Sequence, residues 1–302
     1  MAEMEKKKLG IYLLLILPPL FWAGNAVLAR GVADLIPPVA MSFWRWALAL
    51  LILLPFTWKQ TCRDWPEIRK HWKIIFLLGL LGIASFNTLL YAAAHSTTAI
   101  NIALTQSVMP VIIVVISFLL FRDRITPLQL FAIALCTVGA GHIVIHGDLQ
   151  RLLQLEFVRG DLFMLLAVSL YGLYSVLLRK RPDIAPMSFL TTTFAVGVVL
   201  LLPLYLWEYQ SAPPLHLTQP VVFSLLYVAF CPSILAYLFW NRGIHEIGAN
   251  QAGLYINLIP LFASLLAVIF LGERFQGYHI VGIILIASGL LMFNLLPLWR
   301  KE

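Results

Sequence analysis

Short polar turns divide the chain into ten apolar stretches, each about the length that a helix needs to cross a membrane. About 20 predominantly apolar residues span the roughly 30 Å hydrocarbon core of a bilayer. The pattern predicts an all-α membrane protein with ten transmembrane helices. The expected spans are Leu9–Ala29, Pro38–Trp58, Trp72–Ala94, Thr97–Phe121, Thr126–His146, Gly160–Leu178, Pro186–Trp207, Pro220–Trp240, Gly248–Leu271 and Gly277–Leu296.

The composition excludes an ordinary soluble domain. Of the 302 residues, 61% are hydrophobic and 12% are charged, whereas soluble domains carry about 25% charged residues. The net charge of +7 does not indicate nucleic-acid binding, because that function needs a basic stripe on one face and the basic residues here are scattered through short loops. The three cysteines, Cys62, Cys136 and Cys231, have unrelated spacings and predict neither a disulfide framework nor a zinc site.

The first span has a basic start that could be taken for a secretory signal. Lys6, Lys7 and Lys8 precede it, but a cleaved signal has an apolar region of only about 7 to 15 residues. The run here is longer, so we expect it to be retained as a transmembrane helix.

Basic residues in short loops predict the orientation, because they concentrate on the cytoplasmic side. Of the 21 Lys and Arg residues, 16 fall on the side of the N-terminus, four fall on the opposite side, and Arg45 lies within a span. We therefore expect both termini in the cytoplasm, with the protein in the cytoplasmic (inner) membrane.

The two halves of the sequence match each other. Leu77–Ala140 aligns without gaps to Tyr227–Leu290 at an offset of 150 residues, and earlier positions align at offsets of 148 and 149. Equivalent pairs include Trp22 with Tyr171, Pro38 with Pro186, His95 with His245, Pro110 with Pro260 and Gly139 with Gly289. We expect two five-helix repeats, residues 1–150 and 151–302. Five is an odd number, so the second repeat enters the membrane from the other side, a construction used by secondary transporters.

Several motifs resemble the EamA family of the drug/metabolite transporter superfamily, over essentially the whole chain. They are Phe21-Trp22-Ala23-Gly24-Asn25, Arg45, Pro110, Arg122-Asp123-Arg124, Pro260, Leu271-Gly272-Glu273-Arg274, Gly282 and Gly289. The resemblance implies ten helices, transport of small metabolites, and a central cavity made by the first four helices of each half. The fifth helices would be peripheral. One departure is Phe121-Arg122-Asp123, where the family has Leu-Gly-Glu, which weakens any shared role for the carboxylate.

Arg45 stands out because it is a formal charge well inside a span. Even the lenient insertion scale assigns such an arginine a cost of about 2.5 to 3.5 kcal/mol. Two interpretations stay open: its planar fork of donors faces the cavity and binds a substrate carboxylate, or it lies near the outer end of its helix and snorkels to the membrane surface or bonds to loop carbonyls.

Aromatic and amide side chains within the spans form the remaining set of candidate cavity residues. A buried amide needs a partner, so these side chains are expected to face inward, toward substrate or toward other helices. With Arg45, the predicted substrate-binding residues are Trp22, Asn25, Asn87, Tyr91, Gln106, Tyr171, Tyr174, Tyr237, Trp240, Gln251, Tyr255 and Asn257.

The span prolines and the acidic residues bear on mechanism. Pro110 and Pro260 each remove a helical hydrogen bond and are predicted hinges, and Glu273 is expected to cap the last helix. His95 and His245 are expected in equivalent hairpins. All 14 acidic residues fall in loops, tails or helix ends, so we expect facilitated, exchange-type or weakly proton-coupled transport in place of a strong pump.

Together these features predict a secondary transporter that moves a small amphipathic metabolite, an amino acid or amino-acid-derived compound, outward by alternating access. Importing a vitamin or exporting a drug or metallophore are alternatives within transport. A sensor or assembly factor on the same fold is the alternative of another class. No catalytic constellation or Walker-type loop is present, so no enzyme, cofactor or metal is expected; the expected partners are the substrate and the bilayer, with a homodimer left open.

Overall fold

The computed structural model describes the chain except for residues 1–9, 33–34, 155–156, 212–216, 272–273 and 300–302. It is all-α. The first half contains α2 (Leu17–Gly31), α3 (Pro38–Lys70), α4 (Trp72–Leu78), a π-helical segment η1 (Gly79–Ser85), α5 (Phe86–Ala94), α6 (Ala99–Ser107), α7 (Met109–Phe121), α8 (Pro127–Val144) and α9 (Leu149–Leu153). The second half contains α10 (Arg159–Leu177), η2 (Leu178–Lys180), α11 (Pro186–Ser211), α12 (Gln219–Ala229), a π-helical segment η3 (Phe230–Leu235), α13 (Ala236–Ile247), α14 (Ala249–Gly253), η4 (Leu254–Asn257), α15 (Leu258–Leu271) and α16 (Gly277–Trp299).

The predicted spans correspond to these helices. Nine helices of the described part are long and apolar enough to cross a membrane. The tenth expected span is α16, which contributes a shorter apolar stretch, Gly277–Phe293. The all-α membrane fold and its duplicated halves are thereby confirmed.

Some boundaries differ from the expected ones. Helix α3 is 33 residues long and continues past Trp58 as a polar extension. Helix α13 also runs on, so that His245 lies in its last turn and the chain turns only at Gly248, whose φ is +84°. Glycine adopts this left-handed φ without steric cost, which explains why the turn falls there.

Local capping explains where several helices begin. The Thr98 side chain accepts a bond from Asn101 N at the start of α6, and Thr126 with Gln129 forms a capping box on α8. The start of α3 is capped from the other half, because the Glu208 carboxylate of α11 accepts bonds from Val39 N (3.0 Å) and Ala40 N (2.6 Å). A carboxylate is favourable at this positive end of a helix dipole.

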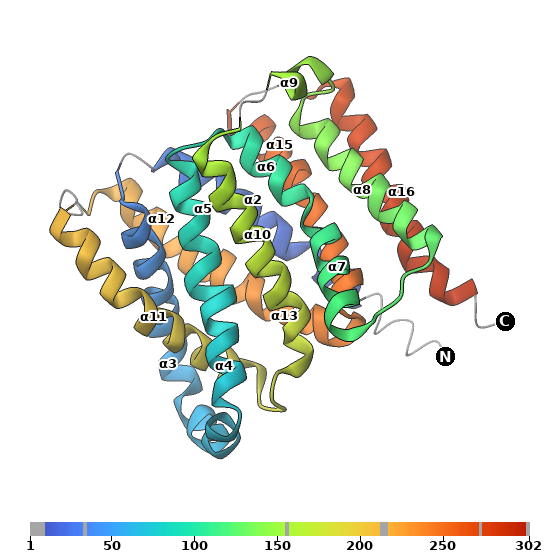
Figure 1. Cartoon of the computed structure of the whole chain (residues 1–302). Coiled ribbons are helices and arrows are strands. Elements are labelled where there is room, and N and C mark those ends of the chain that lie inside the picture. Colours follow the sequence, from blue (N-terminus) through green and yellow to red (C-terminus); the bar gives the residue numbers. More distant parts are fainter. Residues whose placement is uncertain (1–9, 33–34, 155–156, 212–216, 272–273, 300–302) are drawn as a thin grey trace.

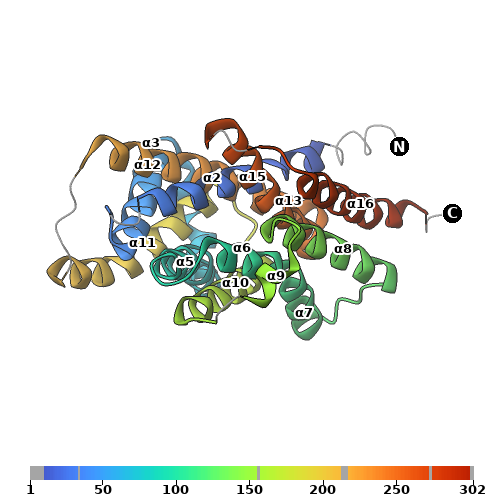
Figure 2. The same cartoon turned by 90° about the horizontal axis from the view of Figure 1, so that it is seen from above.

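The halves pack reciprocally. Helix α10, the first of its half, lies against α5 and α7 of the other half, while α2 lies against α13 and α15. Helices α3 and α11 pair along much of their length at one edge of the bundle (Figures 1 and 2).

The fifth helices, α8 and α16, form a separate pair at the opposite edge (Figure 1), as the family resemblance implied. Their equivalent glycines set the close approach: a Cβ added at Gly139 would lie 2.8 Å from Leu285 Cβ, and one at Gly289 would lie 2.6 Å from the Ala132 carbonyl oxygen. The other eight spans therefore surround the middle of the protein.

Candidate functional site

Equivalent helices of the two halves are irregular at equivalent places. The π-helical segments η1 and η3 coincide at the 150-residue offset. The fourth spans are also broken at matching positions, between α6 and α7 in the first half and through the 3-10 segment η4 in the second. Pro110 follows the first break and Pro260 the second. Discontinuous helices near the membrane centre are a feature of transporter binding sites, and a hinge at either proline remains a prediction.

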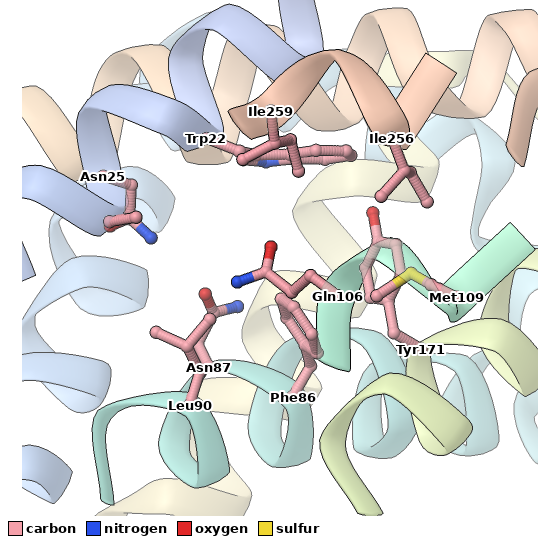
Figure 3. A pocket seen from close by; sticks show the side chains of 11 residues that line it. Trp22, Asn25, Phe86, Asn87, Leu90, Gln106, Met109, Tyr171, Ile256 and Ile259 are labelled. Carbon is pink, nitrogen blue, oxygen red and sulfur yellow. The ribbon is translucent and has the colours of Figure 1, made fainter. Parts of the chain in front are cut away.

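A central cavity lies among these irregular segments. Its volume for the centre of a water-sized sphere is about 20 Å³, which is room for about one water molecule, so the cavity is nearly closed in this structure. Both halves contribute to its lining, which consists of Trp22, Asn25, Ala26, Phe86, Asn87, Leu90, Gln106, Met109, Tyr171, Ile256 and Ile259. Figure 3 shows Trp22 on one side and Phe86, Asn87 and Leu90 on the other, with the Gln106 amide between them.

Arg45 lies behind this cavity in the protein interior. It is the eighth residue of α3, about 10 Å along the helix axis from the first residue, and its side chain is completely buried, with a relative exposure of 0%. Its Nη1 donates to Asn87 Oδ1 (2.7 Å), to the Tyr91 hydroxyl (2.9 Å) and to Asn25 Oδ1 (3.3 Å). It is not among the residues that line the cavity.

The remaining donors of Arg45 reach the other half of the protein. Nε donates to Ser233 Oγ (2.6 Å), and Nη2 donates to the Pro232 carbonyl oxygen (3.0 Å) in η3. The guanidinium is thus held by neutral oxygens. In the described part of the chain, no Asp or Glu oxygen lies within ion-pair distance of it.

The two π-helical segments accept bonds in a matching way. The Pro232 carbonyl of η3 accepts from Arg45 and from Trp22 Nε1 (3.2 Å) of the first half. At the equivalent position of η1, the Gly82 carbonyl accepts from the Tyr237 hydroxyl (2.5 Å) of the second half. The irregular backbone frees these carbonyls, and side chains of the opposite half bind them.

Aromatic side chains of the second half cluster around Trp22 beside the cavity. Trp22 makes edge contacts with Tyr171, Tyr237 and Trp240 at centroid distances of 5.3–6.3 Å. The Trp240 Nε1 donates to Ser175 Oγ (3.3 Å). Because Tyr237 and Trp240 are almost completely buried in this cluster, they support the cavity without lining it.

The structure gathers some predicted residues and separates others. Trp22, Asn25, Asn87, Gln106 and Tyr171 line the cavity, whereas Arg45 and Tyr91 lie directly behind Asn25 and Asn87. The others, Tyr174, Tyr237, Trp240, Gln251, Tyr255 and Asn257, are not in the lining. Whether any of them contacts substrate remains a prediction.

Sequence reasoning missed the apolar lining and the oxygens that hold Arg45. Phe86, Met109 and Ile259 belong to a strongly apolar sequence, in which no pattern marks a cavity-facing residue. The role of Pro232 and Ser233 could have been predicted, because a proline inside an apolar span leaves backbone carbonyls without their helical hydrogen bonds.

Two carboxylates serve structural contacts. Asp161, near the start of α10, accepts from Thr97 Oγ1 (2.5 Å), Asn101 Nδ2 (3.0 Å) and Val158 N (2.8 Å). Asp123 accepts two bonds from Arg179 and one from Ser117. Partial burial raises the pKa of Asp123, but these bonds and the charge of Arg179 outweigh it and hold the pKa below the usual value.

Asp123 does not cap the next helix, since Thr126 does so. The preceding Arg122, where the family motif has glycine, adopts a left-handed φ of +58°. The expected capping role of Glu273 lies outside the described residues.

The duplicated helical bundle, its matching helix breaks and its central cavity define a membrane transporter built from two inverted repeats. Residues 9–145 and 158–295 each match the EamA-like transporter family. The chain belongs to this family, whose members are transporters and not enzymes.

Individual relatives agree with this assignment. The chain is 28% identical over 289 residues to the uncharacterized transporter YyaM of Bacillus subtilis, covering 94% of this chain and 93% of that one. It is 30% identical over 246 residues to protein PecM of Dickeya dadantii, covering 80% and 79%. A solved crystal structure superposes with a TM-score of 0.78 at 16% identity, covering 97% of this chain and 99% of that one, which shows a shared fold.

Proposed function

We propose that this transporter moves a small amphipathic metabolite, an amino acid or amino-acid-derived compound, across the cytoplasmic membrane by alternating access. The observation that carries the proposal is the cavity between the repeats, where aromatic side chains meet a row of amides. Trp22, Phe86 and Tyr171 suit an apolar body, and Asn25, Asn87 and Gln106 suit a polar head. The outward direction is proposed by analogy with the family.

We further propose facilitated or exchange-type movement. None of the residues that line the cavity is acidic, so no lining carboxylate is available to carry a proton with the substrate. His95 caps the end of α5 and His245 lies in the last turn of α13, both apart from the cavity lining.

The substrate can be sought by untargeted metabolomics of cells and medium, comparing deletion, wild-type and overexpressing strains. An exported metabolite accumulates in the medium on overexpression and inside the cells on deletion. The purified protein in proteoliposomes should then exchange labelled for unlabelled compound without an imposed proton gradient.

His95→Gln and His245→Gln should leave this exchange largely intact. Strict dependence on a proton gradient, abolished by either change, would show a coupled mechanism in which the histidines take part. A metabolite that accumulates inside the cells on overexpression would reverse the proposed direction.

A further inference from the structure

We propose that the polar side of the cavity is a binding site for an anionic, acceptor-rich group such as a carboxylate, formed by neutral amide donors that Arg45 orients from behind. This inference rests on the proposed function and names the chemistry that the cavity selects. It assigns Arg45 a positioning role in place of direct contact with substrate.

The orientation of the two asparagines follows from what Arg45 can offer. A guanidinium has hydrogen-bond donors only, so the amide ends that face it must be the carbonyl oxygens Asn87 Oδ1 and Asn25 Oδ1. Asn25 Oδ1 also accepts from the Tyr91 hydroxyl at 3.0 Å. Flipping either amide would place an NH₂ group against an N–H donor. Arg45 therefore fixes both amides with their oxygens toward it and leaves their NH₂ groups for other partners.

These donors are left without protein acceptors. Asn87 is 1% exposed, and its Nδ2 makes no hydrogen bond within the described part of the protein; the same holds for the hydroxyl of Tyr171, which is 2% exposed. The Tyr237 hydroxyl lies near both groups and donates its own proton to the Gly82 carbonyl, but neither Asn87 Nδ2 nor the Tyr171 hydroxyl reaches it with hydrogen-bond geometry. A buried donor without a partner is unfavourable, so these groups favour a ligand that brings acceptors.

The other polar groups of the lining point to the same ligand. No described residue accepts a bond from Asn25 Nδ2, and Gln106 makes no side-chain hydrogen bond to the described residues. Figure 3 shows the amides of Asn25, Asn87 and Gln106 around one space. The NH₂ groups of Asn25 and Asn87 and the Tyr171 hydroxyl therefore make this side of the cavity rich in donors, and the Gln106 amide, which no described residue orients, can turn its NH₂ group toward the same ligand.

Charge adds to this preference. The Arg45 guanidinium is permanently charged and is compensated only by neutral oxygens. An uncompensated charge acts over a longer distance in a low-dielectric interior than in water. Since no lining residue is acidic, the field in the cavity favours a negative group and opposes a cationic one.

Arg45 itself is committed to protein contacts. Its Nε and both Nη nitrogens already donate to oxygens of both halves, and the amides of Asn25 and Asn87 stand between it and the cavity. A carboxylate would therefore be bound by amide N–H groups, with the guanidinium as their fixed support.

The test uses three probes with one carbon skeleton: 3-phenylpropionate, its carboxamide 3-phenylpropionamide, and 3-phenylpropylamine. Ligand-induced thermal stabilisation of the purified full-length protein measures their binding. The wild-type protein should bind the carboxylate most tightly and the ammonium compound most weakly. Absence of stabilisation by the carboxylate, or a preference for the amine, would overturn the inference.

The decisive variant is Asn87→Asp, which keeps the shape of the side chain and replaces its NH₂ donor by a carboxylate oxygen. Loss of a charged hydrogen bond should weaken binding of 3-phenylpropionate about ten-fold or more, while the carboxamide changes little. The matched control is Asn241→Asp, a buried residue bonded to Tyr174 away from the lining, which should keep the order of the three probes.

Two further variants test the same inference in case Asn87→Asp does not fold. They also separate the orientation of the amides from the charge of Arg45. Asn87→Leu removes the donor without adding a charge and should bring the carboxylate and the carboxamide to similar affinity. Arg45→Lys keeps the charge but loses the fork that holds both amides, and should reduce the carboxylate preference in the same way. Equal discrimination in wild type and all these variants would contradict the inference.

Binding and transport are read separately. A protein that selects carboxylates in the thermal assay but shows no exchange in proteoliposomes would refute the proposed transport alone. A protein that exchanges a metabolite but does not distinguish carboxylate from carboxamide would refute the binding chemistry alone.

Discussion

Replacing Arg45 by methionine should abolish transport of an anionic substrate and leave the fold intact. Methionine is unbranched and fills irregular core space, so it can follow much of the path of the arginine stem. The change removes a buried charge together with all of its hydrogen bonds. Whether the protein survives depends on how many of its acceptors keep another partner.

Most of those groups keep another partner. The Pro232 carbonyl retains the bond from Trp22 Nε1, and Asn25 Oδ1 retains the bond from the Tyr91 hydroxyl. The hydroxyls of Tyr91 and Ser233 lose a donor but still donate, to Asn25 Oδ1 and to the Val228 carbonyl. Among the described residues, Arg45 is the only donor to Asn87 Oδ1. Leaving that oxygen unpaired costs about 1–3 kcal/mol.

This cost is offset because the variant no longer buries a charge, and burying a charge costs several kcal/mol per ion in real proteins. We therefore expect the free energy of unfolding to change by less than about 2 kcal/mol, a shift of less than about 8 °C in Tm. Transport should nevertheless fall below about a tenth of the wild-type rate, because the amides of Asn25 and Asn87 lose the donor that orients them, and an amide that flips costs the bound carboxylate a charged hydrogen bond worth about that factor.

The assay is thermal unfolding of the detergent-purified protein, followed by fluorescence-detected size exclusion, alongside exchange in proteoliposomes. The double variant Arg45→Met/Asn87→Leu removes the orphaned oxygen and should regain stability without regaining transport. Failure of both variants to accumulate as folded protein would refute the reasoning and make Arg45 a structural residue.

Three further predictions concern topology, packing and pH. Reporter fusions at Glu302 and at Gly147 should give opposite readouts, cytoplasmic and periplasmic, because basic loops stay inside; a periplasmic Glu302 would contradict the ten-span inverted arrangement. Gly139→Leu should lower Tm by separating α8 from α16, whereas Gly141→Leu, where an added Cβ meets its nearest atom at 3.9 Å, should be tolerated; equal effects would mean that the close glycine contact does not matter. The pKa of Asp123 is lowered in the folded protein by its bonds to Ser117 and Arg179. Its contribution to stability, less than about 1 kcal/mol, is therefore present at pH above the pKa of the unfolded chain and is lost as the pH falls through the pKa of the folded protein. Asp123→Asn should remove this acid-dependent part of the unfolding curve, and an unchanged curve would show that the carboxylate contributes nothing.

The fold was accessible from the sequence because a bilayer imposes a simple rule on helix length and polarity. The spans and the duplication could both be read from apolar runs and matched positions. Pro38 illustrates the agreement, since it was predicted to begin a span and does begin α3.

The site was only partly accessible, because the lining depends on helix rotation and on irregular backbone. Arg45 was correctly singled out as costly, but the sequence could not show that Asn25 and Asn87 stand between it and the cavity. The π-helical segments were not predicted, because glycines at Gly79 and Gly82 are compatible with ordinary helix packing in membranes.

The aromatic cluster makes the cavity asymmetric. Three lining positions of the first half correspond to aromatic residues in the second: Asn25 to Tyr174, Asn87 to Tyr237, and Leu90 to Trp240. These aromatic side chains are buried and do not line the cavity. All amides of the lining therefore come from the first half, so a molecule bound between two duplicated halves meets two chemically different walls and has one preferred orientation, with its polar end toward the first half.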